Sequence, residues 1–524
     1  MVMQANRRLL VLALRAAALT MVLVGVEAAS AQGAATLDNA TCLGCHGVPG
    51  LTAPGADGHI RTLFVPADQL SKSVHGTLQC IDCHATIELP HKNLPGTLEE
   101  RGRQRLAINK SCGNCHAMAW RSYMETYHGQ VAVLGYADVA TCFDCHGSHA
   151  ILRASDPASS VFSANLLNTC QKCHQQATPG FATFESHATT DDFARYPYVW
   201  ITSKFVNVAV GGVLVFFWIH SALWFYRELR DRQQGKPRPN VRTDALPQGE
   251  GRHFQRWSPV WRWAHLVFAL SIILLVMTGV TLLYPNTSWA PVLERAMGGA
   301  RIAGIVHRVA AVIMMAVFAA HIIYAAIHIA RNWKTFKVFG PYSLMPNLQD
   351  ATDFVAMFKW FFGRRPRPTF DHWNYQQKVD YWAPFGGIAM LAATGAMLWF
   401  KTLTAAYLPG WTFNVATVAH GDEALLAAAY LFTVHYFVNH WRPDKFPLDI
   451  VIFTGSMPLE EFKREYAVEY NRLVETGELQ RYLVDAPSRP LTLGSKIIGF
   501  SLVAVGLVLL VMMAIGFSGN LIGG

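Results

Sequence analysis

The sequence has few charged residues, and none of its cysteines lies outside one repeated pattern. Only 15% of its 524 residues are charged, 52% are hydrophobic, and the mean hydropathy is +0.21. Soluble domains carry about 25% charged residues, so this composition excludes an ordinary soluble protein and favours a membrane protein. The chain also lacks a nucleotide-binding loop, a zinc-site pattern and the cysteine spacing of an iron–sulfur cluster.

The formal net charge of +9 does not indicate a nucleic-acid partner. Many of the Lys and Arg residues lie in loops between hydrophobic segments, as is typical of topology signals in membrane proteins. We therefore predict membrane lipid as a contact and no nucleic acid.

All ten cysteines belong to five Cys-x-x-Cys-His units. This spacing is the attachment pattern of c-type haem, in which two thiols bind one porphyrin and the following histidine reaches the iron. A single match would also fit a zinc half-site or a redox dithiol, and disulfides are the usual alternative in exported segments. Five complete units that use every cysteine favour five covalent haems. The units are Cys42/Cys45/His46, Cys80/Cys83/His84, Cys112/Cys115/His116, Cys142/Cys145/His146 and Cys170/Cys173/His174.

The segment before the first unit has the features of a secretory signal, namely Arg7 and Arg8, an apolar run, and the small residues 29–31 as a cleavage site. Residues 32–197 then lack long apolar runs, so we expect short helices and loops wrapped around porphyrins. Six histidines outside the units are candidate distal iron ligands, and the sequence does not assign them to individual haems. They are His59, His75, His91, His128, His149 and His187.

Six hydrophobic segments are each long enough to cross a bilayer, which takes about 20 helical residues. Loops 227–259 and 332–380 are rich in Lys and Arg, whereas loops 285–301 and 401–411 are poor in both. The positive-inside rule places the two basic loops in the cytoplasm and residues 32–197 outside. We also expect a charged surface helix at 457–485. The segments are 198–226, 260–284, 302–330, 381–400, 412–438 and 494–517.

Histidines inside these segments indicate a second kind of site, because ionisable residues in a membrane are costly and usually functional. His307 and His321 are fourteen residues apart, and His420 and His435 are fifteen apart. Four helical turns take about 14.4 residues, so each pair lies on one helix face, separated by about 21 Å. This suits one haem near each membrane surface. The second span adds His265 at its inner end, so that His435 faces either His265 or His321.

Three other polar residues near the inner surface are weak candidates for a quinone contact, and an interfacial role is the favoured reading for each. They are His328, His440 and Asp444. His220, in the first span, is predicted to be interfacial.

The segment 256–265, which ends at His265, together with the following run to Gly279, resembles the first helix of bacterial di-haem cytochromes b. These are the membrane subunits of formate dehydrogenases and nickel–iron hydrogenases. The helix that begins near His307 and the segment from His420 to His435 resemble two further helices of that family. The resemblance, over 255–445, implies an outer haem b between His307 and His420.

For the inner haem b, the resemblance implies His265 and His435. His321 stays an alternative to His265, because its spacing from His307 is closer to that in cytochromes b of quinol–cytochrome c reductases. The N-terminal fragments 73–76, 127–129 and 145–149 resemble pieces of small multihaem c cytochromes.

These observations predict a mainly α protein of the bacterial inner membrane, with five haem c, two haem b and quinone or quinol as substrate. We expect electron transfer between the quinone pool and a periplasmic redox protein. The alternatives are electron delivery from a periplasmic dehydrogenase to quinone, and a multihaem reductase of a small oxyanion. The expected parts are a signal peptide (1–31), a periplasmic pentahaem cytochrome c domain (32–197), an anchor helix (198–230), a cytoplasmic linker (231–254), a four-helix di-haem cytochrome b domain (255–445), a cytoplasmic segment (446–493) and a C-terminal span (494–524).

Overall fold

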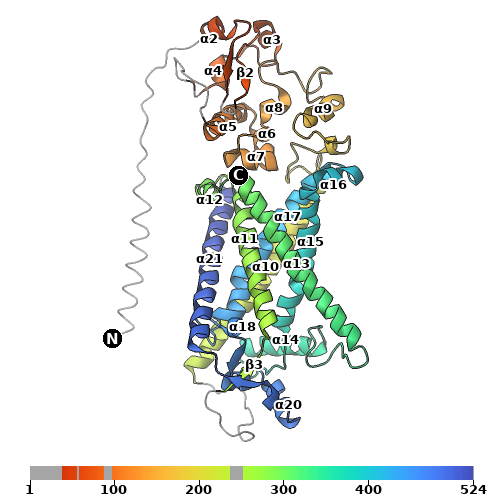
Figure 1. The fold of residues 1–524 in the computed structure, drawn as a ribbon, viewed down its shortest axis with the longest axis vertical. Coiled ribbons are helices and arrows are strands. Elements are labelled where there is room, and N and C mark those ends of the chain that lie inside the picture. Colours follow the sequence, from red (N-terminus) through yellow and green to blue (C-terminus); the bar gives the residue numbers. More distant parts are fainter. Residues whose placement is uncertain (1–37, 56–57, 86, 88–96, 236–251, 523–524) are drawn as a thin grey trace, which may run out of the picture.

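The computed structural model describes residues 38–522 except 56–57, 86, 88–96 and 236–251. The expected signal peptide, most of the expected linker and His91 lie outside these residues. Figure 1 shows three parts stacked along the long axis: a part of short helices, a bundle of long helices, and a small cap at the opposite end.

The N-terminal part consists of short helices with one two-stranded antiparallel sheet, in which Thr52 pairs with Thr62. Its buried apolar residues Val131, Ala132 and Val139 pack against Leu282 and Ala300 of the bundle. Its elements are α2 (Asn39–His46), β1 (Thr52–Pro54), β2 (Ile60–Thr62), α3 (Ala67–Lys72), α4 (Cys80–Cys83), α5 (Leu98–Cys115), α6 (Ala117–Met124), α7 (Tyr127–Val133), α8 (Cys142–His146), η1 (Ser163–Asn165), α9 (Leu166–Gln171) and η2 (Phe181–Thr183).

Among the residues that the structure describes, five helices of the bundle are long and apolar enough to cross a membrane. They are α10 (Pro197–Gln233), α11 (Pro259–Leu283), α13 (Ala300–Arg331), α15 (Tyr375–Trp399) and α21 (Arg489–Ile522). The segment 412–438, expected as a further span, is also helical but does not meet the same criteria. It comprises α17 (Trp411–Tyr430) and two π-helical turns, η3 (Leu431–His435) and η4 (Phe437–Trp441). Six membrane spans therefore stay a prediction.

Helices α11 and α13 pack side by side, as do α15 and α17, while α10 lies against α17 and α21 against α11. Glycines in α21 permit its close approach: a Cβ at Gly516 would collide with the ring of Tyr284, and one at Gly506 with Phe432 and Tyr436. Two segments expected as loops contain short helices, α12 (Ala290–Ala296) and α16 (Lys401–Tyr407), and α14 (Leu348–Phe361) lies at the cap end.

The cap is a folded unit with its own core. A three-stranded antiparallel sheet has the order β4-β3-β5, and the rings of Phe254 and Phe462 stack with centroids 3.6 Å apart. The expected surface helix at 457–485 is wrong: the segment forms short helices and strands, and its Glu465 and Glu469 are buried. The elements are β3 (Arg252–Gln255), α18 (Val451–Thr454), β4 (Ser456–Pro458), α19 (Leu459–Glu465), α20 (Ala467–Glu475), η5 (Leu479–Tyr482) and β5 (Leu483–Asp485).

A buried ion-pair network fastens the cap to the bundle. Glu465 contacts Arg442 and Lys445, each at 2.8 Å. Arg367 bonds Glu228 of α10 at 2.7 Å. Burial alone would raise the pKa of Glu465, but the charges of Lys445 and Arg442 outweigh it and hold this pKa well below the usual range.

We predict that Glu465→Gln lowers the free energy of unfolding of the cap by about 3 kcal/mol, because it leaves two buried cations without their shared partner. Because the native pKa of Glu465 is depressed, its contribution is present above the usual glutamate pKa and is lost as the pH falls. Thermal unfolding followed by circular dichroism at neutral and acidic pH measures this. Glu460→Gln, at an exposed site, is the control. Equal melting of Glu465→Gln and wild type at neutral pH would contradict the assignment.

Candidate functional site

In four of the five cysteine units the structure brings the unit's histidine opposite a second histidine from elsewhere in the N-terminal part. The separations of the ring centroids fall between 5.9 and 6.3 Å. The pairs are His116 with His75, His84 with His149, His174 with His128, and His146 with His187.

This separation fits one metal ion between each pair of rings. Two imidazoles that bind one iron from opposite sides, each nitrogen about 2 Å from the metal, have ring centres roughly 6 Å apart. The gap is too wide for a direct hydrogen bond between the rings. The donor set of two histidines and two nearby thiols therefore fits a c-type haem.

Each cysteine pair lies in or beside a short helical turn, which brings positions i and i+3 to one side. In two units the residue before the second cysteine is an aspartate that caps its own turn. Asp82 accepts the N–H of Gln79 at 2.8 Å, and Asp144 accepts the N–H of Thr141 at 2.7 Å. These caps satisfy amide groups that a four- or five-residue helix leaves open.

The exposure of the thiols depends on their position in the unit. All ten are free of disulfides, and the first cysteine of every unit is partly buried. The exposed second cysteines are Cys45, Cys83, Cys115 and Cys173, whereas Cys145 is partly buried.

A hydrogen bond to an asparagine side chain links two pairs of successive units. The Asn39 side-chain oxygen accepts the N–H of Cys80 at 2.7 Å, and the Asn109 oxygen accepts the N–H of Cys142 at 2.8 Å. Asn39 lies three residues before Cys42, the first cysteine of the first unit, and Asn109 lies three residues before Cys112, the first cysteine of the third unit. The first unit is thus fastened to the second, and the third to the fourth, in the same way.

Hydrogen bonds to the Nδ1 atom orient two of the histidine rings in the N-terminal part. His46 Nδ1 lies 2.8 Å from the carbonyl oxygen of Leu63, and His187 Nδ1 lies 3.0 Å from the hydroxyl of Ser122. Such contacts leave Nε2 for a metal. Burial lowers the pKa of His128 to about 4, so this imidazole is neutral near pH 7, the form that ligates metals.

Of the six distal candidates, His59 and His91 are left for the first unit. His59 is exposed, and His91 lies outside the described residues, so the choice between them stays open.

Inside the bundle, His307 of α13 faces His420 of α17 with ring centroids 6.3 Å apart. The two rings are held in matching ways: the Thr278 hydroxyl lies 2.8 Å from Nδ1 of His307, and the Thr394 hydroxyl lies 3.0 Å from Nδ1 of His420. The separation of the two rings again fits an iron bound from both sides.

A glycine follows each of these threonines, and each glycine lies against the histidine ring. A Cβ at Gly395 would come within 3.2 Å of Cε1 of His420, and one at Gly279 within 3.7 Å of Cε1 of His307. The helix pairs α11/α13 and α15/α17 therefore repeat one arrangement. The sequence interpretation missed the second Thr-Gly, although its likeness to the first was a usable signal.

At the inner end, His435 lies in the π-helical turn η3. Its Nδ1 is 3.4 Å from a carboxylate oxygen of Asp380 and 3.2 Å from the side-chain nitrogen of Asn439. His265 lies within electrostatic reach of His435 and His440. Among the described residues, the buried Nδ1 of His265 has no hydrogen-bond partner. Such an unsatisfied buried atom fits a site that is completed by another group.

His321, the alternative ligand, has a different environment. Its Nε2 lies 2.9 Å from the hydroxyl of Tyr381. The structure therefore brings His265, rather than His321, toward His435.

The three weak candidates for a quinone contact have other partners in the structure. Asp444 belongs to the ion-pair network, and His440 accepts the N–H of Asp449 at 3.3 Å. His328 lies beside Asn332 on an exposed turn. The prediction that His220 is interfacial is wrong, because it is 2% exposed and bonded to Tyr375 and Gln376.

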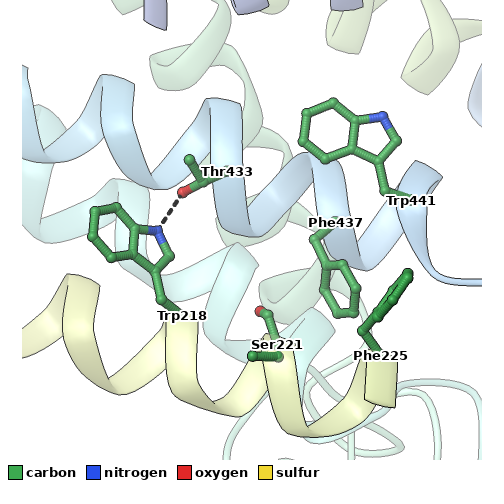
Figure 2. Close-up of a pocket in the computed structure, with 7 residues that line it drawn as sticks. Trp218, Ser221, Phe225, Thr433, Phe437 and Trp441 are labelled. Atoms are coloured by element: carbon green, nitrogen blue, oxygen red, sulfur yellow. Dashed lines mark hydrogen bonds between the residues drawn. The ribbon is translucent and has the colours of Figure 1, made fainter. Parts of the chain in front are cut away.

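A groove of about 380 Å³ lies between α10 and the turns η3 and η4. Figure 2 shows aromatic rings along it, and a hydrogen bond of 2.8 Å from Trp218 to the Thr433 hydroxyl across it. None of its lining residues is ionisable. They are Trp218, Ser221, Ala222, Phe225, Thr433, Phe437 and Trp441.

Residues 182–340 match one family model, that of prokaryotic cytochrome b561. The matched range includes α10, α11 and α13, and with them His265 and His307. No curated protein matches the chain. The match covers less than half of the chain and supports a membrane cytochrome of the b type.

Proposed function

We propose that the chain is a membrane electron conduit that holds two haem b in the bundle and five haem c in the N-terminal part. The observation that carries this is the set of five histidine pairs at 5.9–6.3 Å. When bound, the haems supply one-electron carriers between the quinone pool and a periplasmic redox partner.

The c-haem ligands follow from the pairs. The proximal histidine of each unit binds from one side, and the facing histidine binds from the other. His75 serves the third unit, His149 the second, His128 the fifth and His187 the fourth. Four haems with both axial positions filled argue against an oxyanion reductase, which needs an open iron.

The five units follow one another in space in the order of the sequence. The Asn39 contact brings the first unit beside the second, and the Asn109 contact brings the third beside the fourth. Cys83 lies near the third unit, and Cys145 lies near the fifth. We infer a single row of sites in which the fifth is nearest to the bundle and the first is farthest from it.

Two aromatic rings bridge the fifth unit and the bundle. The rings of His174 and Phe181 are 5.0 Å apart, and those of Phe181 and Phe413 are 5.8 Å apart. Phe413 and His420 are seven residues apart on α17, so they lie on one face about 10.5 Å apart along the axis. The fifth c site therefore lies above the outer b site.

Hydrogen bonds fix this junction. The Gly410 N–H donates to the carbonyl oxygen of Gly180 at 2.8 Å, and the Asn414 side chain donates to the carbonyl oxygen of Glu185 at 2.9 Å. Such contacts hold the two parts at a constant separation, which a tunnelling path requires.

For the bundle we propose His307 with His420 as ligands of the outer haem and His265 with His435 as ligands of the inner haem. Asp380 then orients His435, and its carboxylate strengthens the ligand. The basic segments lie at the cap end, opposite the N-terminal part, which supports a periplasmic position for that part in a bacterial inner membrane.

His420→Ala should lower the haem b content from two per chain to one and leave all five haem c, because the latter are covalently attached. A pyridine haemochrome assay with a haem stain counts both kinds. His328→Ala is the control, since this histidine has no partner histidine in the proposal. Unchanged haem b in His420→Ala would exclude this residue as a ligand.

His187→Ala should convert one haem of the five from the low-spin to the high-spin state, because it removes a distal ligand. EPR at low temperature detects the change. Ser122→Ala, which removes only the Nδ1 contact of His187, should stay low-spin. A fully low-spin His187→Ala would show that the pair does not ligate one iron.

A quinol analogue should reduce the c haems of the purified protein, as followed by their visible absorption. If it does not, but a periplasmic dehydrogenase does, then electrons flow toward quinone and the alternative direction holds.

A further inference from the structure

One polar pair inside the apolar helices has no part in the proposed conduit. His321 of α13 and Tyr381 of α15 meet with Nε2 and the hydroxyl oxygen 2.9 Å apart. A histidine in a membrane span is costly and marks a functional site by default. Here the ring is oriented by a tyrosine, although the proposed ligands for both haems b lie elsewhere.

The pair lies among aromatic rings. Trp261 of α11 meets His321 edge to face, with centroids 5.2 Å apart, and it contacts Tyr324 at the same distance. Phe385 lies 5.3 Å from Tyr381. These rings give flat apolar surfaces beside two hydrogen-bonding groups, the combination that a small aromatic ligand requires.

The site opens toward lipid. His321 and Tyr381 are both only partly buried. The residues after His321 are exposed on the surface of a candidate membrane span, with Ile322 at 42% and Ile323 at 58%. A ligand with a long apolar tail can therefore enter from the bilayer and leave its tail along α13.

The pair also adjoins the inner haem site on two sides. Trp261 lies one helical turn before His265 on α11. Tyr381 follows Asp380, whose carboxylate lies 3.4 Å from Nδ1 of His435. Each proposed ligand of the inner haem is therefore linked to the pair through one intervening residue, His265 through Trp261 and His435 through Asp380.

We propose that His321 and Tyr381 bind the head group of an isoprenoid quinone or quinol, an inference that rests on the proposed function. The tyrosine hydroxyl donates to an oxygen of the ring, and the imidazole accepts from a quinol hydroxyl. Trp261 packs against the ring. The groove in Figure 2 is the competing location, but none of its lining residues is ionisable, so it offers no side chain that could exchange a proton with the head group.

The test measures binding of the fluorescent quinol analogue 2-heptyl-4-hydroxyquinoline N-oxide to the full haem-loaded protein by fluorescence quenching. We expect His321→Phe to weaken binding by about tenfold or more, and Tyr381→Phe by several-fold, through loss of hydrogen bonds to the head group. Thr433→Val, in the groove, should bind like wild type. Haem b content should stay at two in every variant.

Normal binding by both His321→Phe and Tyr381→Phe would overturn the proposal, and so would weakened binding in Thr433→Val alone. Loss of a haem b in His321→Phe would also overturn it, because His321 would then be a haem ligand. Tyr381→Phe keeps the test decisive if His321→Phe does not fold. Failure of the wild-type protein to bind the analogue would instead count against the quinone link in the proposed function.

Discussion

The arrangement of this protein depends on pairs of imidazole rings that face each other across about 6 Å. Rings at this distance are too far apart for a direct hydrogen bond. Five pairs with nearly the same separation, drawn from short helices in one part and long helices in another, point to one common partner. An iron atom bound from both sides is the group that fits this separation.

The two parts hold their rings by different means because their chains differ. The N-terminal part has a small apolar core, so caps, asparagine contacts and the covalent attachment positions set its geometry. The bundle uses two helix pairs of the same design, in which a threonine orients the histidine and a glycine gives the ring room. In both parts, a hydrogen-bonding group near Nδ1 orients some of the rings, as at His187 and His307, and the other ring nitrogen can then face a metal.

Local features could be predicted from the sequence, whereas long-range partnerships could not. The cysteine units and the apolar segments are contiguous, so composition and spacing identify them. The distal histidines follow no constant spacing: His75 lies before the unit that it faces, and His187 lies after its own. Residues 457–485 were misread because their buried charges pair with residues outside the segment, as Glu465 does with Arg442 and Lys445. His220 was misread because an adjacent helix covers it.

The sequence by itself determined the attachment units, the apolar segments and the short list of histidines, because each depends on neighbours along the chain. Only the tertiary structure decided which histidine faces which, brought His265 rather than His321 toward His435, and joined His321 to Tyr381. These choices depend on the packing of helices that are far apart in the sequence. A separation of a few ångströms between two rings is a property of that packing, and no local pattern encodes it.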